Sequence, residues 1–411
     1  MAVLLTDDLL CEIFERVKDV ATLFRCATAC SAWCRLFVDH PSFVRRCLTE
    51  DVCRSSPFPG FFAQPMWHQR DTCPARFIQP PRPVFGSSHR FISSFITNID
   101  DPGFFDNAVP IVSRHGLLLV RLHLYLRGDV LCVCNLLAGT FAVLPCLGVE
   151  DCPIYDFDMT QYALLAATDL SSSNNDQPQE RQQQRSTPFK VLVLATRERP
   201  RQYLLCTFSS TGAQRWNICL GNLKGNDNHV LVDQHNAVVC NGVARWPFSA
   251  TSGFYTLDVS AETCHVSFTD LELPKKLHWE KIRYSRGEPY ISVDIHGRLV
   301  FLYQVDGVRL EIWTQHNNGT WADTRMLELT QPDRYRNRTY SLVYTFLGEK
   351  DGTLLIKDDH YHVYTVDVNT GVMMEVTDWP QLFILNRKRT VPLEMDWPTF
   401  FASRLGVIST K

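Results

Sequence analysis

A four-strand unit that recurs along most of the chain constrains the fold more than any other feature of the sequence. From residue 111 to about residue 380, short apolar runs rich in Val, Leu and Tyr follow one another and are separated by Gly, Asn, Asp and Pro. Each unit opens near a Gly-containing turn, passes through a strand that leads into an Asn- or Asp-containing turn, and closes near Leu or Leu-Pro. Such openings occur at His115-Gly116, Gly253, His296-Gly297 and Asp351-Gly352.

This repeat predicts an all-β propeller. Its spacing of roughly 45 to 65 residues suits propeller blades with loop insertions. About five blades fit between residues 111 and 380, and strands near Phe91 to Thr97 and Phe383 to Leu405 would complete another, which gives about six blades. The alternative is a series of unrelated hairpins in one or two sandwiches.

Residues 5 to about 48 carry a helical pattern that the rest of the chain lacks. In the first part, apolar residues recur at helical spacing. They are Leu9, Leu10, Ile13, Phe14 and Val17. A second apolar series from Leu23 to Phe37 keeps a 3.6-residue period, which predicts one continuous buried helix, and Pro41 opens a short third helix. A helical fragment of about 40 residues cannot bury enough surface to be stable alone, so part of its apolar surface must pack elsewhere.

Composition divides the chain into three parts. We expect a helical domain at 1–50, an ordered Pro- and Phe-rich linker at 51–84 and a β domain at 85–411. The polar, low-complexity stretch at about 171–187 predicts a disordered insertion in the β domain. The expected fold class is therefore α+β and multidomain, with a small helical domain followed by an all-β, about six-bladed, propeller-like domain.

Charge and cysteine content exclude several classes of function. Lys and Arg number 41 against 44 Asp and Glu, a net charge of −3, so no long-range field would attract nucleic acid or an anionic membrane. The 15 cysteines include no Cys-x-x-Cys pair, which argues against a zinc ribbon and favours reduced thiols. Asp7 and Asp8 stand where a signal peptide needs basic residues. The apolar run from Leu117 to Leu126 is far shorter than the ~20 residues of a membrane-spanning helix. We therefore expect a cytoplasmic or nuclear protein that binds neither nucleic acid nor membrane.

Two clusters of potential metal ligands have simpler structural explanations. Cys26, Cys30 and Cys34 could share one helical face, but buried cysteines usually pack as small apolar residues. The run from Asp358 to His362 combines acids and imidazoles, and a turn followed by a strand explains it better. No motif typical of serine hydrolases, P-loop NTPases, zinc proteases or dinucleotide-binding enzymes occurs in the sequence. We expect no metal, no cofactor and no catalytic residues. A propeller enzyme with carboxylates around its axis is the least favoured alternative.

The N-terminal segment resembles the F-box motif. The resemblance rests on Leu5 to Phe14, on Arg16-Val17 and on Ala29 to Trp33. The Pro- and Phe-rich segment and the β-rich remainder are similar in layout to plant F-box proteins with propeller-like C-terminal domains. The chain differs from the family at Thr6, Lys18 and Val20, where prolines are common. The resemblance implies a substrate-recognition subunit of a Skp/cullin/F-box ubiquitin ligase, which is not itself an enzyme.

The resemblance also implies a partner surface on the helices. Through it the chain would bind a Skp-type adaptor and, through the adaptor, cullin. The matching positions are Leu5, Leu9, Leu10, Ile13, Val17, Leu23 and the aromatic Trp33. A helical fragment with apolar residues on more than one face suits the hydrophobic groove of a partner. The alternative is that these side chains cover the bottom of the propeller.

The β domain would bind the protein to be ubiquitinated, whose identity the sequence does not reveal. Propeller loops supply recognition, and aromatic and Arg residues dominate such contacts. The candidates are Trp246, Tyr335, Arg336 and Arg338. Trp246 precedes Pro247 and has an alternative role in packing within a blade. A second hypothesis for the whole chain is an F-box-like scaffold that acts outside the ligase.

Overall fold

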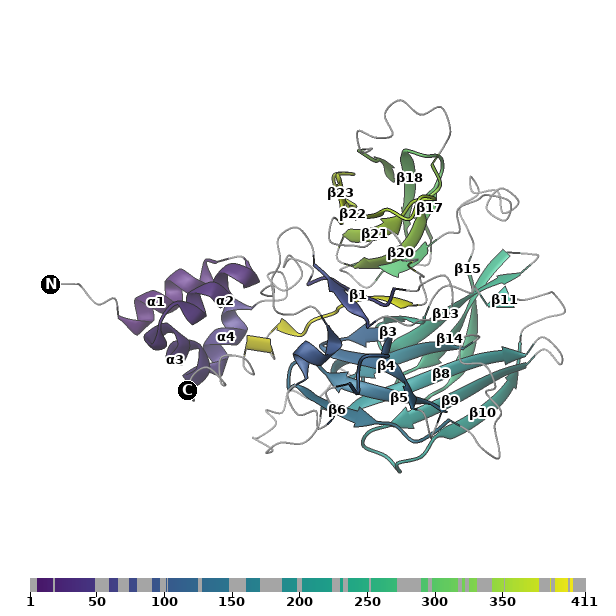
Figure 1. Cartoon of the computed structure of the whole chain (residues 1–411), viewed down its shortest axis with the longest axis horizontal. Coiled ribbons are helices and arrows are strands. Elements are labelled where there is room, and N and C mark those ends of the chain that lie inside the picture. Colours follow the sequence, from purple (N-terminus) through teal and green to yellow (C-terminus); the bar gives the residue numbers. More distant parts are fainter. Residues whose placement is uncertain are drawn as a thin grey trace.

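The structure is a computed structural model of the chain (Figure 1). It describes residues 6–17, 19–48, 59–65, 74–79, 91–96, 101, 103–124, 128–147, 160–170, 187–197, 202–223, 230–231, 236–250, 253–271, 290–294, 298–316, 320–321, 325–330, 342–350, 352–376, 385, 389–397 and 400–401. The stretch 171–186, expected to be disordered, lies outside these residues. Within them, no helix is both long enough and apolar enough to cross a bilayer.

Six antiparallel sheets form a six-bladed β-propeller in the described part of the chain (Figure 1). Blade 1 contains β3 (Val109–Arg114), β4 (Leu117–Leu124), β5 (Gly128–Asn135) and β6 (Thr140–Val143). Blade 2 contains β7 (Gln161–Ala166), β8 (Phe189–Arg197), β9 (Gln202–Ser209) and β10 (Asn217–Asn222), with the short helix α6 (Ala167–Leu170) after β7. Blade 3 contains β11 (Val230–Leu231), β12 (Val238–Cys240), β13 (Val243–Ala250), β14 (Gly253–Ser260) and β15 (Val266–Leu271).

The remaining blades complete the ring. Blade 4 contains β16 (Tyr290–Val293), β17 (Leu299–Gln304), β18 (Arg309–Thr314) and β19 (Arg325–Glu328). Blade 5 contains β20 (Thr345–Lys350), β21 (Thr353–Lys357), β22 (Val363–Asp367) and β23 (Met373–Glu375). The closing blade contains β1 (Phe61–Ala63), β2 (Arg76–Ile78) and β24 (Thr390–Pro392). The inner strands β3, β7, β12, β16, β20 and β24 contact one another in that cyclic order, and β24 contacts β3. This closed cycle confirms the predicted propeller with six blades and rules out the sandwich alternative.

Apolar side chains on both faces of the strands explain the continuous apolar runs in the sequence. In β4, Leu118 packs in the core that includes the helices, whereas Leu117 and Leu119 pack in the core between blades 1 and 2. A strand that is buried on both faces does not alternate between polar and apolar residues. In the sequence, the turns between the strands therefore carry most of the signal for the repeat.

The closing blade pairs the first strand of the propeller with the last. Phe62 of β1 pairs with Phe77 of β2 on one side and with Val391 of β24 on the other. The segment 51–84 therefore supplies two propeller strands, which corrects its prediction as a linker. The prediction of a strand near Phe91 to Thr97 is also wrong, because Ile92–Phe95 forms the 3-10 helix η1.

Four helices precede the propeller: α1 (Asp7–Glu15), α2 (Val20–Ala29), α3 (Ser31–Asp39) and α4 (Pro41–Cys47). The predicted single helix from Leu23 to Phe37 is two helices, because Cys30 adopts an extended conformation (φ −154°, ψ 161°) between α2 and α3. Cys26, Cys30 and Cys34 consequently do not share one helical face. Asp19 caps α2 by accepting a hydrogen bond from the backbone N–H of Thr22 at 2.8 Å.

Aromatic side chains hold the helices together and attach them to the rest of the chain. Phe14 of α1 lies 5.2 Å from both Trp33 and Phe37 of α3, measured between ring centroids. Phe401, from the C-terminal part of the chain, lies 5.4 Å from Phe24 and 6.1 Å from Phe37. The apolar surface that the helices cannot bury among themselves is thus covered in part by the C-terminal segment, as their small size requires.

Candidate functional sites

The exposed face of α1 carries two large apolar side chains. Leu9 and Ile13 are 49% and 48% exposed, and they lie one helical turn apart on the same side of α1. Leu10 and Phe14 point the other way, into the helical core. In Figure 1, α1 lies on the side of the helical domain away from the propeller. We call Leu9 and Ile13 the α1 patch.

The remaining predicted adaptor residues have other environments. Leu10 and Leu23 are buried in the core that the helices share with the propeller. Val17 and Trp33 are half-buried and pack against the same core. Leu5 lies outside the described residues. Of the predicted adaptor residues that the structure describes, Leu9 and Ile13 are thus exposed, and the others pack in or against the core.

The described residues do not show the four predicted substrate-binding residues as one exposed surface. Trp246 lies in the middle of β13 and is fully buried, in a core that blades 2 and 3 share. The prediction that it contacts a substrate is wrong, and the alternative role in blade packing is correct. Tyr335, Arg336 and Arg338 lie in the segment between β19 and β20 that falls outside the described residues.

The acid and histidine run at Asp358 is structural. Asp358 is buried and accepts hydrogen bonds from the backbone N–H groups of His360 at 2.8 Å and His362 at 2.9 Å. The hydroxyl of Tyr364 donates to the same carboxylate at 3.2 Å. These bonds fix the turn before β22. Among the described residues, no group of three or more His, Cys, Asp and Glu side chains could hold a metal ion.

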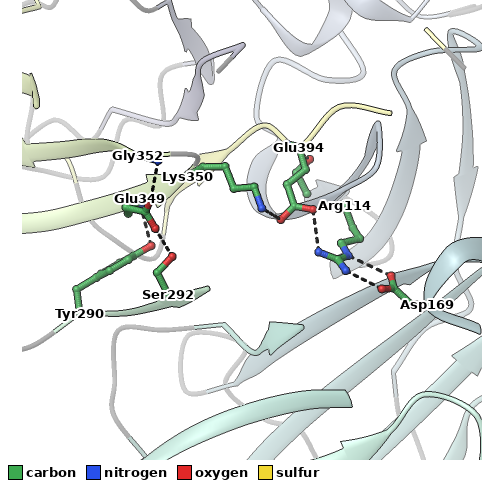
Figure 2. A network of polar contacts seen from close by, with 9 residues as sticks. Arg114, Asp169, Tyr290, Ser292, Glu349, Lys350, Gly352 and Glu394 are labelled. Atoms are coloured by element: carbon green, nitrogen blue, oxygen red, sulfur yellow. Dashed lines mark hydrogen bonds and ion pairs between the residues drawn. The ribbon is translucent and has the colours of Figure 1, made fainter. Parts of the chain in front are cut away.

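A cluster of charged residues that sequence reasoning missed lies at one end of the inner strands. Arg114 ends β3, Lys350 ends β20, Asp169 follows β7 in α6, and Glu394 follows β24. We call these four residues the ring-closing network (Figure 2). They come from blades 1, 2 and 5 and from the closing blade, so the network joins four blades across the ring.

The geometry of the network is specific. Arg114 donates two hydrogen bonds to Asp169, from Nε at 3.0 Å and from Nη2 at 2.6 Å. Its Nη1 donates to Glu394 at 3.0 Å, and Lys350 Nζ donates to the other oxygen of Glu394 at 2.9 Å. The backbone of Glu394 is held as well, because its N–H donates to Ser113 Oγ at 3.2 Å and its carbonyl accepts from Gly116 at 2.7 Å.

A second set of bonds links blades 4 and 5 at the same place (Figure 2). The carboxylate of Glu349 accepts hydrogen bonds from the hydroxyl of Ser292 and, at 3.1 Å, from the backbone N–H of Gly352. The backbone N–H of Glu349 donates to the hydroxyl of Tyr290 at 3.0 Å. Because β16 carries Ser292 and Tyr290, these bonds attach its blade to β20.

The surroundings keep Glu394 and Arg114 charged. Burial alone would raise the pKa of Glu394, but Lys350 and Arg114 outweigh it and lower that pKa below its usual range. Burial would lower the pKa of Arg114, whereas Glu394 and Asp169 raise it above its usual value. Burial and Arg114 lower the pKa of the adjacent His115. Two cations and two anions in mutual contact act as a clamp between blades.

No protein-family model matches the chain. No curated protein matches it. Among solved structures, TolB from Acinetobacter baumannii is similar over 82% of this chain and 67% of its own, at 8% identity and a TM-score of 0.39. The GH93 α-L-arabinofuranosidase of Fusarium graminearum is similar over 65% of this chain and 80% of its own, at 10% identity and a TM-score of 0.35. A prolyl oligopeptidase B from Galerina marginata is similar over 70% of this chain and 34% of its own, at 10% identity and a TM-score of 0.30. Sequence identities and TM-scores this low say nothing about what this chain does.

Proposed function

We propose that this chain is the substrate-recognition subunit of a Skp/cullin/F-box ubiquitin ligase. The α1 patch is the observation that carries the proposal. Leu9 and Ile13 expose close to half of their surface on a helix whose other face is fully used for packing. Exposed apolar pairs at i and i+4 on a helix suit a partner's hydrophobic groove. The resemblance of the same segment to the F-box motif supports a Skp-type adaptor as that partner.

The architecture supports a separate binding role for each part of the chain. The helices would hold the adaptor and, through it, cullin, while the propeller would hold a target protein. Such a subunit performs no chemistry; its contribution is to bring lysines of the target near the charged ubiquitin-carrying enzyme. The core shared by the helices and the propeller would keep the two binding surfaces in a fixed relative orientation.

The test is adaptor binding by a variant that changes the α1 patch alone. Replacing Leu9 and Ile13 by Asp places two unpaired charges in an apolar contact, so we expect binding to a purified Skp-type adaptor to fall by at least about a hundredfold. The thermal unfolding of the chain should be unchanged, because both side chains are already half exposed. The matched control is Met374→Asp in β23, where the replaced side chain is 43% exposed and lies in the propeller.

Two outcomes would refute the proposal. One is a wild-type chain that does not bind the adaptor; the other is an α1 double variant that binds it with unaltered affinity. A chain that binds the adaptor but supports no cullin-dependent ubiquitination would instead favour a scaffold that acts outside the ligase.

A further inference from the structure

The outer strand of blade 2, β10, is unlike the outer strands of the other blades. All of its residues except Gly221 are exposed, and Leu220, at 56%, is the most exposed large apolar side chain in the described part of the chain. Ile218 is 46% exposed. The sequence from Asn217 to Asn222 contains no charged residue and no proline.

Proteins usually protect the outer edge of a sheet with charges, prolines, bulges or short strands. The strands β2, β15, β19 and β23 each contain a charged residue, and β6 is four residues long. The six residues of β10 pair with β9 along one side. Within the described residues, no strand or isolated bridge pairs with its other side.

The two faces of β10 differ. Ile218 and Leu220 stand opposite Cys206 and Leu204 of β9, both of which belong to the core between blades 1 and 2. On the other face, Gly221 leaves room for Tyr203, since a Cβ at Gly221 would lie 2.2 Å from Cζ of that ring. A strand added to this edge would thus place every second side chain beside Ile218 and Leu220. Its other side chains would lie on the face of Gly221, which has no side chain of its own.

The start of β10 is held in place. The indole N–H of Trp216 donates to the carbonyl of Pro145 at 2.8 Å, and its ring lies 5.5 Å from that of Phe208, between centroids. An edge that is already ordered loses little conformational freedom when a second strand pairs with it.

Arg215 supplies a charge at the same end. Its side chain is exposed, and it forms no ion pair with any other described residue. An acidic residue on an incoming strand would complement it. A second copy of β10 would not supply that acidic residue, because the described residues from Arg215 to Leu223 contain neither Asp nor Glu.

We propose that β10 is a docking edge for an extended segment of the target protein. The segment adds a strand to blade 2, places apolar side chains against Ile218 and Leu220 at alternate positions, and carries an acidic residue beside Arg215. The identification of this segment as part of a ubiquitination target rests on the proposed function; the strand addition itself does not.

The experiment measures binding of a fluorescent probe peptide, Thr-Val-Thr-Val-Thr-Val-Asp, to the full-length chain without adaptor by fluorescence anisotropy. A second probe has Lys in place of Asp, and a third has N-methyl groups on alternate amides, which block pairing without changing the side chains. We expect the acid-ended probe to bind about tenfold more tightly than the lysine-ended one and the N-methylated probe not to bind.

Three variants locate the site. Replacing Ile218 and Leu220 by Lys should weaken binding by at least about tenfold. Arg215 lies outside β10, and the Arg215→Glu variant should reverse the preference between the two probe ends. Met326→Lys, in β19, replaces a side chain that is 48% exposed and should bind like wild type. The Arg215 variant keeps the test valid if the strand variant fails to fold.

Several results would overturn the inference. The inference fails if the acid-ended probe does not bind, if the N-methylated probe binds equally well, or if Arg215→Glu leaves the preference between the two probe ends unchanged. Sedimentation velocity would overturn the choice of occupant if wild type dimerises and the Lys variant does not. A wild-type chain that binds the probe but not the adaptor would refute the ligase proposal alone.

Discussion

Arg114 and Glu394 are 280 positions apart in the chain, yet the guanidinium of one donates to the carboxylate of the other at 3.0 Å. The pair joins blade 1 to the closing blade beside the point where β24 contacts β3. Ring closure in this propeller thus combines short backbone pairing in the closing blade with side-chain charge.

Replacing Glu394 by Gln should destabilise the whole ring. Arg114 and Lys350 would lose the charged carboxylate that they share, although Arg114 would keep its pair with Asp169. Both cations stay largely shielded from water, so the loss lowers the free energy of unfolding by on the order of 3 kcal/mol. Urea titration at pH 7 measures this change. Asp306→Asn is the control, because the ion pair of Asp306 with Arg309 is exposed and its loss should matter far less. Equal losses in the two variants would show that the network does not stabilise the ring.

The same carboxylate should make stability depend on acid pH. Because the pKa of Glu394 is lower in the folded chain than in the unfolded one, the ionised form contributes stability above the unfolded value of about 4.3, and that contribution is lost as pH falls toward the folded value. The gap in urea midpoint between wild type and Glu394→Gln should therefore be smaller at pH 3 than at pH 7. A gap that stays constant between these two pH values would contradict the assignment.

Two glycines in blade 5 should differ in their tolerance of a side chain. Gly371 and Gly352 have similar positive φ values, +75° and +76°. A Cβ at Gly371 would lie 2.0 Å from the backbone oxygen of Glu328 in blade 4, whereas the nearest atom at Gly352 is the side-chain Nδ2 of Asn369 at 3.3 Å. Thermal unfolding should show Gly352→Ala to cost about 1 to 2 kcal/mol from backbone strain, and Gly371→Ala clearly more. Similar melting temperatures for the two variants would mean that blades 4 and 5 can separate at this contact.

Removal of the Phe401 ring should loosen the helical domain. The ring is fully buried against Phe24 and Phe37, so Phe401→Ala should cost about 3 to 5 kcal/mol. Hydrogen exchange should show faster opening of α2 and α3. Leu9→Ala is the control, because Leu9 is half exposed and should change exchange little. Unchanged protection of α2 in Phe401→Ala would show that the helices are stable without the C-terminal segment.

Turn chemistry made the propeller predictable from the sequence. The glycines at 116, 352 and 371, each at positive φ, mark turns in blades 1 and 5 and kept the repeat visible where buried strands show no alternation. The closing blade was harder to foresee. β1 and β2 are three residues long, and β1 pairs on its other side with β24, more than 300 positions later in the chain, so local pattern carries no information about this pairing.

Other features lacked a local signal for different reasons. The break at Cys30 interrupts an apolar series that keeps its helical period, and nothing in the residue type requires an extended conformation there. The ring-closing network brings together side chains 55 and 280 positions from Arg114, and each looks like an ordinary surface charge in the sequence. Trp246 appeared to belong to a connection because Pro247 follows it, yet β13 accommodates that proline.

The contact between Phe24 and Phe401 has a consequence for the order of synthesis. A ribosome makes α2 and α3 before the propeller, but it makes the Phe401 ring, which fills the space beside these helices, after the propeller. Early domains usually fold as soon as they leave the ribosome. Here the helical core would be complete only after Phe401 has been made, and β1 could pair with β24 only after that strand has been made. A nascent chain interrupted before Phe401 would present an incomplete helical core, so the adaptor binding proposed for α1 would favour chains in which the propeller strands have already been made.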